Sequence, residues 1–215
     1  MPFAVNRMLR HPTEFKMRRR PISLMVNHIV RCAIAISSLV SASSYGTDRY
    51  VIDPEHTFSV FEYSHWGLSL QRGRFDKNSG VIELDLMNKT GSVQIDIDAS
   101  SVSTGVALFD NNLRSTSFFD TAQFPKIAFK STNLRFDDNA RLTGIDGELT
   151  IKGVTRPAKF ELTQFNCRFI VLYLKSACGA NGSTKILRSD FNVGRYVPFV
   201  SDEVTLYFSV EAIKE

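Results

Sequence analysis

Few side chains in this 215-residue sequence have the chemistry of a nucleophile, a general base or a metal ligand. Past residue 42 there are two histidines, His56 and His65, and two cysteines, Cys167 and Cys178. The histidines are nine positions apart in a strand-like segment, and regular pleating would put them on opposite faces about 30 Å apart. We therefore expect no shared metal ion.

The sequence also lacks the spacings that mark common active sites. It has no GxSxG, no HExxH, no glycine-rich phosphate loop and no cysteine–histidine couple of recognisable spacing. Asp96 and Asp98 share a strand face, but paired outward carboxylates are far more often the solvated side of an amphipathic strand. We predict no catalytic residue and no metal site.

The basic residues of the chain are concentrated at its start. Seven of the 26 lysines and arginines lie in residues 1–42 beside one acidic residue, and the remaining 19 basic and 21 acidic residues give no sign of a nucleic-acid surface. A short apolar run, CAIAISSLVSAS, ends at a small-residue cleavage pattern, Val40-Ser41-Ala42. Its uninterrupted apolar part is about ten residues, whereas a membrane span needs roughly 20, so an uncleaved anchor is the weaker alternative.

We predict that residues 1–42 are a signal peptide, with translation starting at Met1, Met17 or Met25, and that residues 43–215 are periplasmic. Export leaves Cys167 and Cys178 as a lone pair, which in an oxidising compartment most often forms a disulfide. A straight strand would separate their Cα atoms by about 36 Å, whereas a disulfide needs about 6 Å, so the chain must double back between them. A reactive thiol or a metal site is the alternative.

Alternating apolar and polar residues dominate the chain from Asp48 onward. GVIELDLMN and SVQIDIDAS are typical of half-buried antiparallel strands, and turn clusters such as DKNSG, NKTG and DDNA separate runs of this kind. One stretch, STGVALFDNNLRS, instead has a Ser/Thr cap and helical spacing of Val106, Phe109 and Leu113. The pattern predicts eight or more antiparallel strands with one short helix, in a closed barrel or a sandwich.

Phenylalanine is frequent, with 17 residues, and Phe118, Phe119, Phe124 and Phe129 lie within twelve positions. Core and cavity wall have the same composition, so these rings could serve either.

Several spaced blocks resemble the YceI-like family of exported lipid-binding proteins. They are YVIDPEHTFSVFEYSH, RGRF, SSVST, LFDNNLRSTSFFDTAQFPKIAFKST, GELTIKGVTRP, ILRSDFNV and SDEVTLYFSVEA, and the resemblance covers residues 49–213. It implies an all-β fold, a single antiparallel eight-stranded lipocalin-like barrel with one short helix. It further implies an interior that holds a long isoprenoid or acyl chain.

On this basis ten residues are candidates for ligand binding. Matching HTFSVFEYSH to the family puts Phe61, Tyr63 and His65 inward and Phe58 and Val60 on the other face. Tyr63 and His65 then either orient a head group or bond to neighbouring strands. Arg188 and Arg114 are candidates to pair with a phosphate or quinone oxygen, although an exposed Arg is usually only solvated surface. The full set of candidate binding residues is Phe61, Tyr63, His65, Phe118, Phe119, Phe124, Phe129, Leu149, Ile151 and Arg188.

One segment departs from the family pattern. FNCRFIVLYLKSAC is unusually apolar, and it is either another core strand or an exposed apolar flap that touches a membrane.

Together these features predict an exported carrier for an isoprenoid-type, quinone-like or long acyl lipid, with no cofactor beyond such a lipid and no reaction of its own. Two alternatives stay open: a hydrolase or isomerase with His65 as base, and a quinone-bearing partner of a membrane redox protein. A homodimer also stays open.

Overall fold

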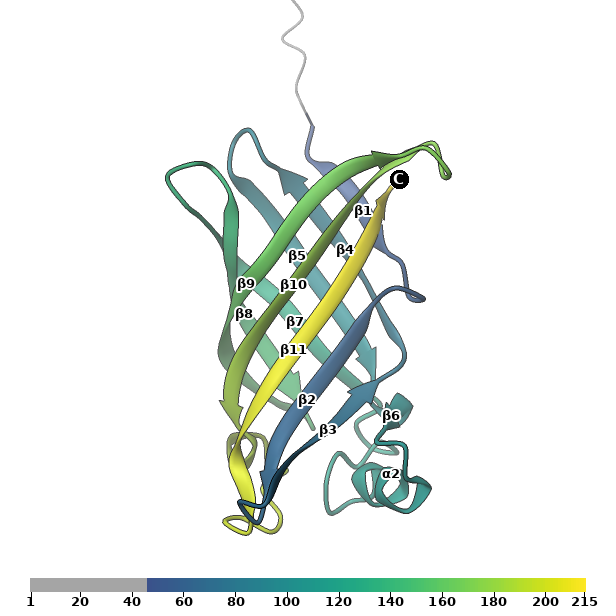
Figure 1. Cartoon of the computed structure of the whole chain (residues 1–215), viewed down its shortest axis with the longest axis vertical. Coiled ribbons are helices and arrows are strands. Elements are labelled where there is room, and N and C mark those ends of the chain that lie inside the picture. Colours follow the sequence, from purple (N-terminus) through teal and green to yellow (C-terminus); the bar gives the residue numbers. More distant parts are fainter. Residues whose placement is uncertain (1–45) are drawn as a thin grey trace, which may run out of the picture. The chain divides into compact units, whose positions relative to one another are not determined.

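The computed structural model describes residues 46–215, so the predicted signal peptide and its cleavage site lie outside the described residues. Strands account for most of this part of the chain (Figure 1). The strands are β1 (Asp48–Ile52), β2 (Phe58–His65), β3 (Ser69–Phe75), β4 (Asn78–Asp85), β5 (Thr90–Asp98), β6 (Val102–Ser103), β7 (Lys126–Phe136), β8 (Leu142–Ile151), β9 (Val154–Ile170), β10 (Lys175–Leu187) and β11 (Val200–Lys214). The helices are η1 (Ala99–Ser101), α2 (Ala107–Arg114) and η2 (Arg188–Phe191).

The strands close into an antiparallel barrel with eight strand positions. β1 and β2 both pair with β11, so together they occupy one strand position of the ring. β4 pairs with β1 and β3 pairs with β2, so β3 and β4 together occupy the next position. β5, β7, β8, β9, β10 and β11 complete the ring. The eight-stranded barrel with one short α-helix predicted from the sequence is confirmed.

A buried asparagine supplies hydrogen bonds to the backbone where two strand positions are interrupted. The chain leaves the sheet between β1 and β2 and again between β3 and β4. Asn78, which is 3% exposed, donates to the carbonyls of Thr57 (3.1 Å) and Phe75 (3.0 Å) and accepts from the Ser59 hydroxyl (2.7 Å). Its side chain thus satisfies backbone groups that the bend would leave unpaired.

The two ends of the barrel are built differently. The closed end, with the β4–β5 and β9–β10 turns, is filled by the buried side chains of Tyr50, Leu134 and Ala212. The mouth end carries the β2–β3 turn, α2 and the connection from η2 to β11 (Figure 1). Here β3 pairs with β2 and β6 while β5 pairs with β4 and β7, so the ladder does not continue from β3 to β5. The segment from η1 to α2 lies on this side of the barrel.

Two local predictions need correction. The helix is present, but its N-cap is Val106, which makes no side-chain capping bond; Thr104 instead donates through its N–H and its hydroxyl to Asp110 Oδ1, at 2.7 Å each. His56 does not lie in a strand but in the connection between β1 and β2, where its Nδ1 is 2.8 Å from Asp53 Oδ2. Pro54 interrupts the strand there, since proline cannot donate to a ladder.

Candidate functional site

The barrel encloses a cavity of about 580 Å³, open at the mouth end. Its inner wall consists of buried apolar side chains from nearly every strand position, namely Phe61, Phe75, Leu84, Val93, Ile127, Phe129, Leu142, Ile145, Leu149, Ile151, Phe160 and Val204. Polar lining residues gather toward the mouth, where His65, Gln71, Asn112 and Arg195 are exposed. The cavity therefore has a mostly apolar wall, and its exposed polar lining residues lie near the opening.

Nine of the ten candidate binding residues line this cavity. They are Phe61, Tyr63, His65, Phe118, Phe119, Phe129, Leu149, Ile151 and Arg188. Phe124 does not; its ring lies against Gly153 in the β8–β9 turn. Phe124 follows an irregular stretch rather than a strand, so alternation gave no guide to its direction. A role in ligand binding stays a prediction for the other nine.

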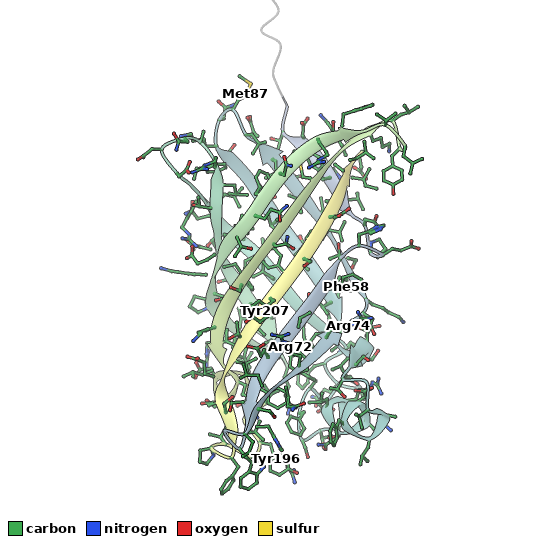
Figure 2. The ribbon with its side chains drawn as sticks, viewed as in Figure 1. Phe58, Arg72, Arg74, Met87, Tyr196 and Tyr207 are labelled. Carbon is green, nitrogen blue, oxygen red and sulfur yellow. A yellow bond between two sulfur atoms is a disulfide. The ribbon has the colours of Figure 1, made fainter. Side chains whose placement is uncertain are left out.

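β2 carries a gradient from buried to exposed groups along one face. Phe61 is buried, Tyr63 is half-buried and stacks on Phe61 with 6.3 Å between ring centroids, and His65 is exposed at the mouth. Burial raises the pKa of the Tyr63 phenol, so it stays a neutral hydroxyl that can donate to a ligand. Phe58 lies on the outer surface, where the Arg74 guanidinium sits 5.1 Å from its ring centroid (Figure 2).

Glycines leave room for two of the large rings on the wall. Gly73 pairs with Phe61 across β2 and β3, and a Cβ at this glycine would overlap the Phe61 ring. A Cβ at Gly147 would likewise collide with the ring of Phe129. Both rings therefore lie against the neighbouring strand, and the centre of the barrel is left unfilled.

Arg188 lines the cavity but is engaged by the backbone. Its Nε donates to Ser201 O (2.7 Å), Nη1 donates to Val193 O and Arg195 O (2.8 and 2.7 Å), and Nη2 donates to Val200 O (2.8 Å). All but one of the N–H groups of the guanidinium are used in this way. Burial lowers the pKa of this guanidinium. Its main task is to hold the connection between η2 and β11, and at most one donor is left for a ligand.

Arg114 also departs from the role predicted for it. Its guanidinium donates to the carbonyls of Ser100 (2.8 Å) and Val102 (2.9 Å), so it fastens α2 to η1 and β6 rather than pairing with a ligand oxygen.

Two basic residues at the mouth were missed by the sequence analysis. Lys152 Nζ donates to Thr116 O (2.9 Å) and Asn192 O (3.2 Å), and Arg195 donates to the Ser117 hydroxyl (2.7 Å). These bonds join the segment before β7 to the one before β11 and so frame the opening. Lys152 and Arg195 lie in turns and loops, where strand alternation does not predict the direction of a side chain.

The histidines form no recognisable catalytic group. Within residues 46–215 no hydrogen bond reaches the His65 ring, although a general base needs a partner that orients it. The His56–Asp53 pair is not part of the cavity lining. Across the described part of the chain, no group of three or more His, Cys, Asp or Glu residues is placed to hold a metal ion.

Cys167 and Cys178 form a disulfide, as predicted, and face each other directly across β9 and β10. The segment between them is an exposed hairpin and not a core strand: Phe169, Val171, Leu172 and Leu174 are each more than half exposed. It extends beyond the closed end (Figure 1). This flap therefore cannot cover the opening through which a ligand enters. No helix among residues 46–215 is long and apolar enough to cross a membrane.

Comparison with known proteins agrees with this geometry. The family model of the YceI-like domain matches residues 50–212. Protein YceI of Escherichia coli O157:H7 is 34% identical over 182 residues, covering 83% of this chain and 94% of that protein. The Campylobacter jejuni YceI protein superposes with a TM-score of 0.60 at 26% identity, over 71% of this chain and 90% of the other. A polyisoprenoid binding domain from Saccharophagus degradans gives a TM-score of 0.57 at 18% identity, over 77% and 98%.

Proposed function

Since the chain belongs to the YceI-like domain family, we propose that it binds a single long-chain lipid in its barrel and carries or sequesters it. The observation that supports this most directly is the 580 Å³ cavity, with its mostly apolar wall and a few polar side chains near its opening. Its volume lies within the range of small-molecule sites, about 300–1,000 Å³. The apolar tail lies among Phe61, Phe129 and Leu149, and the head group lies at the mouth beside Tyr63 and His65.

The ligand class is an isoprenoid, quinone-like or long acyl lipid. A branched or straight hydrocarbon gains free energy from burial against the apolar wall, at about 25 cal/mol per Å². The structural neighbour from Saccharophagus degradans, described as a polyisoprenoid binding domain, supports the isoprenoid member of this class. We propose binding rather than catalysis, since among residues 46–215 no side chain is hydrogen-bonded to the His65 ring and the cavity wall is mostly apolar.

The first test is mass spectrometry of an organic extract of the purified protein. A carrier brings one class of long-chain lipid with it, in an amount close to one molecule per chain. An extract with quinone absorbance would favour the partner of a membrane redox protein. Protein that is repeatedly free of lipid, and that binds no added polyprenol, quinone or fatty acid, would overturn the proposal.

Variants of the wall sharpen this test. Phe61→Asp puts a carboxylate where the tail passes, and an unpaired buried charge is too costly to coexist with bound hydrocarbon, so lipid should be absent. Phe129→Leu keeps the wall apolar and should fold with altered lipid occupancy, at a cost of at most a few kcal/mol. Phe58→Leu, on the outer face, is the matched control and should carry as much lipid as the parent. Unchanged lipid in all three folded variants would remove these rings from the binding site.

We also propose that the protein acts in the periplasm after loss of residues 1–42. The basic leader, the short apolar run and the oxidised Cys167–Cys178 pair support this location. Protein taken from the cell envelope should have its N-terminus near Ser43. Detection of the intact leader on the exported protein would contradict this placement.

A further inference from the structure

Exposed apolar side chains surround the opening of the cavity. They belong to segments far apart in sequence: the β2–β3 turn with the start of β3, α2, and the loop before β11. We call them the mouth rim, whose members are Trp66, Leu68, Leu70, Leu108, Phe109 and Phe199, each more than half exposed. Scattered exposed apolar residues are ordinary, but a group of this size at one end of a monomer marks an interaction surface.

Two of the segments that carry the mouth rim, the β2–β3 turn and the loop before β11, are tied to each other. The Trp66 and Phe199 rings are 4.7 Å apart, and the Trp66 N–H donates to Phe199 O at 2.8 Å. Next to Phe199, Tyr196 lies at the same end (Figure 2), with its ring 6.1 Å from Phe118 in the cavity wall. The rim is therefore continuous with the wall, and an apolar chain leaving the cavity would meet the rim first.

The charges around the mouth rim suit a lipid surface. Residues 65–71 and 192–200 contain no acidic side chain, and Arg195 adds a cation beside Tyr196. The acid of α2, Asp110, accepts from the N–H and the hydroxyl of Thr104 instead of facing outward unbonded. Tryptophan and tyrosine also favour the boundary between lipid head groups and acyl chains, because their rings are amphipathic.

We propose that the mouth rim inserts into the interfacial layer of a phospholipid bilayer while lipid enters or leaves the cavity. This inference rests on the proposed lipid-binding function. A bilayer fits the position better than a protein does, because a protein seated on the rim would cover the opening. With the rim in the interface, an apolar tail passes from the bilayer to the wall at Phe118 without crossing water.

Trp66 supplies the readout, since it is the only tryptophan in the sequence. The full exported chain is mixed with vesicles of phosphatidylethanolamine and phosphatidylglycerol whose acyl chains carry bromine, which quenches tryptophan fluorescence on contact. We expect Trp66 to shift to shorter wavelength and to be quenched. Leu68→Glu should lower vesicle affinity about tenfold or more, because a leucine side chain is lost from the buried surface and a charge replaces it.

Leu172→Glu is the matched control, because Leu172 in the hairpin of the closed end is 83% exposed and Leu68 is 85% exposed. It should leave quenching unchanged. Loss of vesicle binding in Leu172→Glu alone would assign membrane contact to the hairpin and overturn the proposal. A second result would also overturn it: the parent protein is a dimer with unquenched Trp66, and Leu68→Glu dissociates that dimer. A second copy of the chain would then cover the mouth rim. Lipid content is measured separately and tests the proposed function. Lipid-loaded protein whose Trp66 is not quenched would refute membrane insertion of the mouth rim and leave the lipid-binding function standing.

Discussion

The mouth end and the closed end of the barrel stabilise their backbones by different means. At the closed end, β1 pairs with β4 and β11, and backbone hydrogen bonds between strands continue to the edge of the barrel. At the mouth end the ladder runs out, and cationic side chains take its place: Arg114, Lys152 and Arg188 donate to carbonyl groups of irregular segments. A long side chain with several donors can thus satisfy a loop that has no neighbouring strand.

The difference has a functional meaning. Strand pairing closes the ring of the barrel but not its ends, and the closed end is blocked by packed side chains such as Tyr50 and Leu134. Side-chain bonds hold the opening in shape while leaving its centre free. The closed end also carries the only disulfide between described residues, which fixes the base of an exposed hairpin.

The largest effect is expected from removing the cation that holds the mouth. Arg188→Met leaves four carbonyl groups without their donor, so the free energy of unfolding should fall by about 3–5 kcal/mol. Arg188→Lys, which keeps the charge but not the planar fork, should recover only part of this loss. Urea unfolding measures both variants. A loss below about 1 kcal/mol in Arg188→Met would show that water replaces the guanidinium and that the ends do not differ as described.

The next effect concerns the closed end. The double variant Cys167→Ala/Cys178→Ala should lose about 3 kcal/mol, because the unfolded chain regains the entropy that the closed loop removed. Amide exchange should rise in residues 168–177. Cys178 lines the cavity, but alanine keeps that position apolar, so lipid content should stay close to that of the parent. Loss of lipid in this variant would mean that the cavity depends on the disulfide at the closed end.

A smaller effect is expected from filling space on the wall. Gly73→Ala brings a methyl group into the Phe61 ring, and the resulting overpacking should cost about 1–3 kcal/mol. Gly179→Ala is the matched control, since the nearest atom to a Cβ there, Val210 O, is 3.6 Å away. Thermal unfolding of both variants checks the difference. Equal stability would show that the ring moves freely and that Gly73 does not position it.

The smallest effect belongs to the His56–Asp53 pair, in the connection between β1 and β2. The hydrogen bond with Asp53 raises the pKa of His56, and the same bond lowers the pKa of Asp53. The stability that His56 contributes is therefore full below its unfolded pKa, about 6.5, and is lost as pH rises through the raised value. Asp53's share is lost only as pH falls through its depressed pKa. His56→Gln should accordingly destabilise the protein slightly at pH 5.5 and not at pH 8.5, as measured by urea unfolding. The same difference at both pH values would contradict this account.

Strand alternation predicted an antiparallel barrel or sandwich, and the resemblance to the YceI-like family singled out the barrel and much of its wall. It placed Phe61, Tyr63 and His65 along one face of β2, and the separation of the cysteines required the chain to double back, as β9 and β10 do. It could not place Phe124 or the true task of Arg188, because both depend on loops whose path is set by long-range contacts. It also left open which end of the barrel carries the segment between the cysteines. The answer depends on whether β9 runs toward or away from the end of the barrel that carries α2, and no local sequence pattern gives that direction.

The pairing of β1 with β11 governs when the cavity can exist at all. Arg49 Nε donates to Glu215 Oε2 at 2.7 Å, although the two residues are 166 positions apart. The ring therefore closes only after β11 has been synthesised and has paired with β1, and contacts of such long sequence separation are slow to form. A growing chain offers unpaired strand edges and no enclosed interior. Under the proposed function, the lipid is accordingly loaded only after β11 has been made, into a barrel whose ring has closed.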